Sequence, residues 1–81
     1  MNSATKMLSA MRNNPRDWTI EQLHTVARQY GISIRSTGGS HQVFSHESVV
    51  EILSVPAHRP IKPIYVRHFV WLVDKVKESQ E

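Results

Sequence analysis

The residues GISIRSTGGSHQVFS, numbers 31–45, set the architecture of this chain. Ile32 and Ile34 alternate with polar side chains, which is the period of a strand that buries one face. Residues 37–40 are small or polar and include two glycines, so they predict a turn that leads into a second strand over His41–Ser45. A third strand is expected over Ser48–Val55, where β-branched and apolar residues dominate.

Helix signals surround these strands. Thr19 is a good N-cap, and Gln22 follows three residues later, which is the pattern of a capping box. Apolar residues then recur at helical spacing until Gly31, which suits the left-handed residue that ends a helix. Pro63 suits the first turn of a last helix. The broad apolar face of this last helix comprises Ile64, Val66, Phe69, Val70, Val73 and Val76. A further short helix is expected over Thr5–Met11.

The order of these elements predicts an α+β fold, α-β-β-β-α, with a three-stranded antiparallel sheet, helices on one face and an extra short N-terminal helix. We expect one domain over residues 1–81, with its core at about 19–77 and an N-terminal extension over 1–17. Val43 and Phe44 are neighbours on the second strand and must face opposite sides of the sheet. The pattern leaves open which of the two enters the core, and with it the direction of His41.

Composition narrows the function classes. The chain has 81 residues and no cysteine, which excludes disulfides and thiolate metal sites. The first residues lack the apolar run of a signal peptide, and no stretch approaches the ~20 apolar residues of a membrane span, so a soluble cytoplasmic protein is expected. Ten Lys and Arg against seven Asp and Glu give a formal charge of +3, which permits a nucleic acid or an acidic protein as partner.

His41, at the edge of the glycine turn, is the candidate catalytic residue. Glycines let the backbone approach a ligand closely, and backbone amides in such a turn can form an anion-binding nest. Near neutral pH an imidazole can both accept and donate a proton. The alternative is that the glycines only close a hairpin and that His41 is a solvated strand residue.

Two motifs carry a family resemblance. The string Gly39-Ser40-His41-Gln42-Val43-Phe44 resembles the Gly-Ser-His-x-x-Phe/Tyr signature of the HicA family of mRNA interferase toxins. Downstream, VPAHRPIKP at residues 55–63 is similar to that family's Val-Pro-x-His…Ile-Lys-Pro stretch. With the helix–strand lead-in over Leu23–Arg35, the resemblance covers roughly residues 19–76.

The resemblance implies a double-stranded-RNA-binding-like fold, endoribonuclease activity on mRNA, and neutralisation by a HicB-type antitoxin in a type II toxin–antitoxin system. The family's catalytic histidine falls on His41, its motif glycine and serine on Gly39 and Ser40, and its Ile-Lys-Pro lysine on Lys62. We expect the antitoxin to be acidic and to cover His41 and the Arg59–Lys62 loop. The free toxin is expected to be a monomer, and its complex a hetero-oligomer.

The predicted RNA contacts are basic. Lys62 precedes the last helix, which has no Asp or Glu in its first turn, so the helix dipole and the amides there favour a phosphate. Arg59 and Arg67 flank the same end, and Arg35 on the first strand completes the predicted RNA-binding set. The alternative for this segment is an ordinary proline-rich connection with solvated bases.

The other histidines are assigned no chemistry. We expect His24 on the polar side of its helix, His46 in a turn or on the surface, His58 as a structural hydrogen-bonding group and His68 at the margin of the apolar face. No pair has the i, i+4 helical spacing of a metal site, so RNA cleavage is expected to need neither a metal nor another cofactor.

A non-catalytic double-stranded-RNA-binding module is the main alternative, since that fold reads duplex shape through phosphates and 2′-hydroxyls. Such modules usually carry a stronger basic cluster at the last helix than Lys62 and Arg67 provide, which favours the enzyme. A domain that binds only protein is a weaker third alternative.

Overall fold

Over the residues that the computed structural model describes, 3–58 and 60–80, six elements follow one another in the order α-α-β-β-β-α. The helices are α1 (Ser3–Asn13), α2 (Ile20–Gln29) and α3 (Pro63–Ser79). The strands are β1 (Ser33–Ser36), β2 (His41–His46) and β3 (Val49–Pro56). The predicted α+β fold is confirmed, with each expected element shifted by only a few residues at its ends.

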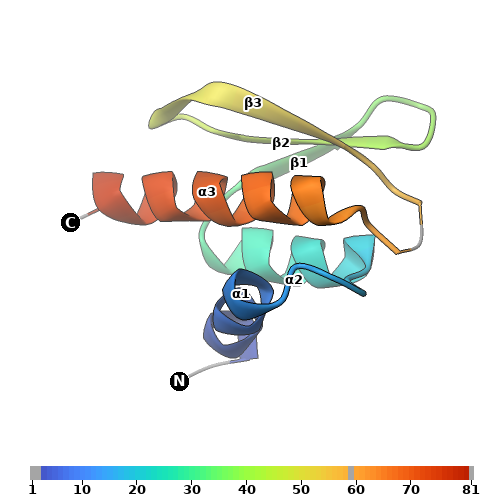
Figure 1. The fold of residues 1–81 in the computed structure, drawn as a ribbon. Helices are drawn as coiled ribbons and strands as arrows, with labels where there is room; N and C mark the ends of the chain where they lie inside the picture. Colours follow the sequence, from blue (N-terminus) through green and yellow to red (C-terminus); the bar gives the residue numbers. More distant parts are fainter. Residues whose placement is uncertain (1–2, 59, 81) are drawn as a thin grey trace.

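The strands form one antiparallel sheet in the order β1-β2-β3, with Phe44 paired to Ile34 on one side and to Leu53 on the other. Figure 1 shows α2 and α3 on the same side of this sheet, and α3 contacts β3 while α2 contacts β1, so both helices cover one face, as the sequence predicts. The residues expected as an N-terminal extension include α1, which packs against α2 and α3 on the side away from the sheet. α1 buries Ala4, Leu8 and Met11 there, so it contributes to the core.

Local signals explain where α2 begins and ends. The Gln22 amide donates to Thr19 Oγ1 at 3.3 Å, and the Thr19 amide donates to Gln22 Oε1 at 2.9 Å, which confirms the capping box. Gly31 has φ +69°, the left-handed conformation that favours glycine after a helix. Short-range chemistry therefore sets where this helix begins and ends.

Phe44, not Val43, enters the core. Phe44 is fully buried, and its ring lies 5.3 Å from that of Phe69 in an edge-on arrangement, whereas Val43 is half-buried. Because side chains alternate along a strand, Val43 faces away from the helices, whereas His41, at the first residue of β2, lines a hollow that it shares with the start of α3. The sequence left the direction of His41 open, and the structure places this residue beside the first turn of α3.

Two side-chain expectations are wrong. The His24 ring lies 6.0 Å from that of Phe44, and its Nε2 atom is buried without a hydrogen-bond partner, so His24 packs toward the sheet and is not on a polar face. Ile64 was expected on the apolar face of the last helix but is 53% exposed. It lies two residues, about 200° around the helix, from the buried Val66, and therefore points away from the core.

None of the helices within residues 3–58 and 60–80 has the length and apolar character needed to cross a bilayer.

An ion pair holds α1 against α3. Arg12 Nη1 and Nη2 donate to the two carboxylate oxygens of Asp74, each at 2.7 Å. The hydrogen bonds from Arg12 hold the pKa of Asp74 below its ordinary value. A carboxylate with a lowered folded-state pKa stabilises the fold above its unfolded pKa of about 3.9, and the stabilisation is lost as the pH falls through the lowered value.

Asp74→Asn should therefore lower the free energy of unfolding by about 0.5–1 kcal/mol at pH 7, the modest size expected for a partly exposed pair. The difference from wild type should shrink as the pH falls below about 4. Urea unfolding across a pH series measures it, with Glu78→Gln, an exposed carboxylate on the same helix, as the control. A difference that persists unchanged at pH 2 would mean that the ion pair is not its source.

Candidate functional site

A pocket of about 390 Å³ lies where β2 begins, β3 ends and α3 begins. Its lining residues are His41, Pro56, His58, Pro60, Lys62 and Tyr65. In Figure 1 this is the end of the molecule where the chain descends from β3 to α3. Both sequence motifs, residues 39–44 and 55–63, contribute to this pocket, so the fold unites segments that the sequence keeps apart.

His41 is the first residue of β2, and its side chain is exposed. Its backbone pairs with Pro56 at the end of β3, and its carbonyl accepts the Thr37 amide at 3.4 Å. These contacts hold the backbone of His41 between the glycine turn and the end of the sheet. An exposed imidazole on a fixed backbone is accessible to a substrate and poised for proton transfer.

The loop that follows β3 is tied back to the body of the protein at two points. The Ala57 amide donates to the Ser40 carbonyl at 2.6 Å, which carries the pairing of β2 and β3 one residue beyond His41. Ile61 is buried, and its amide donates to the Trp18 carbonyl at 2.9 Å. These contacts hold the chain at Ala57 and at Ile61, on either side of the pocket residues His58 and Pro60.

The glycine turn needs glycine at one of its two positions. Gly38 has φ +84°, which side chains rarely tolerate, whereas Gly39 has no positive φ. A Cβ atom built at Gly39 meets nothing within 4 Å. The protein's own packing thus does not require glycine at 39, and a ligand that approaches the backbone closely would supply a reason for it.

Lys62 is the N-cap of α3, as the sequence predicts. It makes no side-chain capping bond, and no acidic residue lies in the first turn of the helix. The positive end of the helix dipole and the ammonium of Lys62 therefore meet at the pocket, an arrangement that favours a phosphate. No described side chain that lines the pocket is acidic.

The structure brings only part of the predicted basic set together. Gly39 and Ser40 directly precede His41 in the exposed turn. Arg35 pairs with Val43, so it lies on the same open face of the sheet as Val43, and it does not line the pocket. Arg67 lines a different hollow, between α3 and the end of α1. Arg59 lies outside the described residues.

Two residues that line the pocket, His58 and Tyr65, were not predicted from the sequence to lie at the candidate site. His58 was expected to have a structural role, although its place in the second motif, four residues before Lys62, was a usable signal. Nothing in the sequence pointed to Tyr65. It lies in the first turn of α3 and is partly buried against the core, so helix packing brings it to the pocket.

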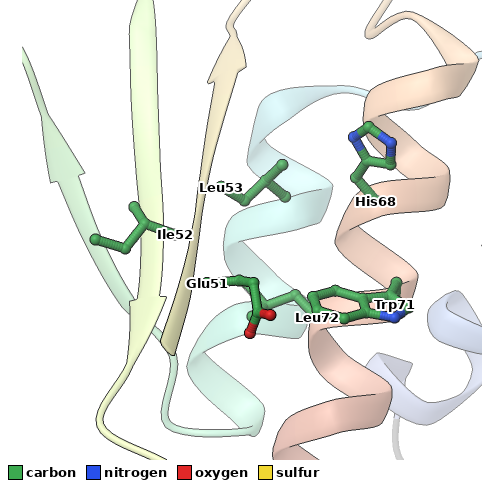
Figure 2. Close-up of a pocket in the computed structure, with 6 residues that line it drawn as sticks. All are labelled: Glu51, Ile52, Leu53, His68, Trp71 and Leu72. Carbon is green, nitrogen blue, oxygen red and sulfur yellow. The ribbon is translucent and has the colours of Figure 1, made fainter. Parts of the chain in front are cut away.

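A second hollow, of about 210 Å³, lies between β3 and α3. Figure 2 shows Leu53 pointing from β3 toward α3, Trp71 reaching from α3 across the gap toward Glu51, and Ile52 pointing away from the hollow. No lysine or arginine lines this hollow within the described residues. The His41 pocket, which has Lys62, therefore suits a phosphodiester better.

The described residues offer no cluster of side chains that would bind a metal ion. Within residues 3–58 and 60–80, no three His, Asp or Glu side chains gather closely enough to hold a metal ion. The chain has no cysteine to add a thiolate. The pocket thus offers imidazole, ammonium and phenol groups, which suit proton transfer and the stabilisation of negative charge.

Comparisons with protein-family models, with curated proteins and with solved structures give no match to this chain. The fold and the pocket define this protein as an α+β domain with two exposed histidines and a lysine at one pocket.

Proposed function

We propose that this protein is the toxin of a type II toxin–antitoxin system, an endoribonuclease that cleaves mRNA in the cytoplasm without a metal and uses His41 for proton transfer. The main support is that His41, from one motif of the HicA resemblance, and Lys62, from the other, line one pocket. A cleavage site for RNA needs a group that moves a proton and a cation that neutralises phosphate charge. His41 and Lys62 supply both.

Growth under induced expression tests this function in the cell. The wild-type chain should arrest growth and shorten the lifetime of bulk mRNA, whereas His41→Ala at the same protein level should do neither. Arrest by both proteins would contradict the enzymatic proposal and favour a non-catalytic RNA-binding module. Western blotting checks that the two proteins accumulate equally.

Lys62 should contribute to RNA affinity without sequence preference, because it meets the phosphate and not the bases. Lys62→Ala should weaken binding about equally for different RNA sequences and reduce the slope of log affinity against log salt by about 0.7–0.9, the value for one phosphate contact. Fluorescence anisotropy on the His41→Ala background, which prevents cleavage, measures both. Lys6→Ala, an exposed lysine on α1, is the control, and an equal slope change there would remove Lys62 from the site.

The proposed inhibitor is an acidic HicB-type antitoxin that occludes the pocket. The chain has a formal charge of +3, and the only charged side chain in the described pocket lining is Lys62, apart from any charge on its histidines. Complementary charge speeds encounter between the two proteins more than it adds affinity. Occlusion of His41 stops cleavage wherever the RNA binds.

Hydrogen exchange on the toxin, alone and with its antitoxin, should show protection at His41 and over Pro60–Lys62. Amides in the turn at Glu47 and Ser48, at the other end of the β2–β3 hairpin, should exchange equally in both samples. Protection at that turn, with His41 and Pro60–Lys62 unchanged, would show that inhibition does not act by occlusion.

A further inference from the structure

The His41 pocket contains a second histidine. Cleavage of RNA by attack of the 2′-hydroxyl requires two proton transfers, one from the attacking oxygen and one to the departing 5′ oxygen. A single imidazole performs one of these at a time. His58 lines the same pocket as His41 and is exposed.

The backbone fixes the juxtaposition of the two histidines. His41 pairs with Pro56 in the last rung of the β2–β3 ladder, and the Ala57 amide then donates to the Ser40 carbonyl at 2.6 Å. His41 directly follows Ser40, and His58 directly follows Ala57. Each histidine is thus one residue from the same hydrogen bond, and the pocket of about 390 Å³ opens between them and α3.

The other titratable groups that line the pocket are less suited to the second transfer. Lys62 offers an ammonium and Tyr65 a phenol, and groups of these two kinds are less common as general acids or bases near neutral pH than imidazole, which can both accept and donate a proton there. The remaining histidines lie elsewhere. His24 packs against Phe44, His46 accepts the Ser48 amide at the far end of β2, and His68 lines the hollow beside β3.

We propose that His58 carries out the second proton transfer, so that His41 and His58 form the general acid–base pair of the reaction. This inference rests on the proposed ribonuclease function. One imidazole, neutral, takes the proton of the 2′-hydroxyl as the 2′ oxygen bonds to phosphorus. The other, protonated, gives its proton to the 5′ oxygen as the bond from phosphorus to that oxygen breaks. The products are a 2′,3′-cyclic phosphate and a 5′-hydroxyl, and Lys62 stabilises the charge on the non-bridging oxygens.

Paired substrates test the proposal with the full-length protein. The first is an RNA oligonucleotide that contains a mapped cleavage site. The second is the same oligonucleotide with sulfur in place of the leaving 5′ oxygen, because a thiolate departs without a proton. His58→Ala should cleave the first substrate about 100-fold or more slowly than wild type. On the sulfur substrate, one of the two variants His58→Ala and His41→Ala should recover most of its loss, and that variant lacks the acid.

The pH–rate profile gives a second readout. The wild-type profile should be bell-shaped, and His58→Ala should lose one limb of it, which a merely structural role would not cause. His68→Ala, an exposed histidine outside the pocket, should match wild type on both substrates. Circular dichroism checks that the variants fold.

Three outcomes would overturn the inference. The first is a rate for His58→Ala within about 3-fold of wild type on RNA, the second is no recovery by either variant on the sulfur substrate, and the third is a bell-shaped profile that survives in His58→Ala. Absence of cleavage of both substrates by wild type is a separate outcome, which overturns the proposed function itself.

Discussion

His41→Ala should fold like wild type and cleave RNA at least about 100-fold more slowly. The imidazole is exposed at the first residue of β2, so its removal takes away no buried contact. Its backbone contacts, the pairing with Pro56 and the bond from the Thr37 amide, do not depend on the side chain. The effect should therefore fall on the reaction and not on the stability of the protein.

Cleavage of a defined RNA in excess EDTA measures the effect, because the proposed reaction uses no metal. Urea unfolding should give the same midpoint for both proteins. Activity of His41→Ala close to that of wild type would remove His41 from the reaction. Loss of wild-type activity in EDTA, with recovery on addition of a divalent ion, would instead reveal a metal requirement.

Phe44→Ala should lower the free energy of unfolding by about 3–5 kcal/mol, the range for loss of a buried aromatic ring. Phe44 is fully buried between the rings of Phe69 and His24. A domain of this size is stable by only about 4–12 kcal/mol, at 0.05–0.15 kcal/mol per residue, so the loss should remove between about a quarter and all of its stability.

Phe44→Leu keeps the measurement possible if the alanine variant does not fold, and we expect it to lose roughly 1–2 kcal/mol. Val43→Ala is the matched control from the opposite face of the same strand, and its cost should stay below about 1 kcal/mol. The urea midpoints of the three variants test which side chains of β2 face the core. Equal losses for Val43→Ala and Phe44→Leu would contradict the placement of Phe44 in the core and of Val43 on the open face.

The elements of the fold followed from short stretches of sequence. The capping box at Thr19, the left-handed Gly31 and the proline at the start of α3 act within one helical turn. The alternation around the glycine turn likewise predicts the β1–β2 hairpin without knowledge of its neighbours. Such signals are local, because hydrogen bonds and steric limits of the backbone act between residues close in the chain.

The candidate site was predictable in part. His41 and Lys62 stood out because each lies at a chemically distinctive boundary, a glycine turn and an uncapped helix start. His58 joined His41 only through the Ala57–Ser40 hydrogen bond, which links two separate segments. Arg67 lies on the side of α3 that faces α1 and not at the His41 pocket. The buried residues of α3 set the rotation of this helix about its axis, and that rotation decides where Arg67 points.

Residue order alone was thus sufficient for the class of fold and the position of its turns. Tertiary packing settled that Phe44 and not Val43 is buried, that α1 completes the core, and that His58 and Tyr65 share a pocket with His41. These features depend on strand register and on the rotation of each helix about its axis. Both are fixed by contacts between residues far apart in the chain, which no local pattern encodes.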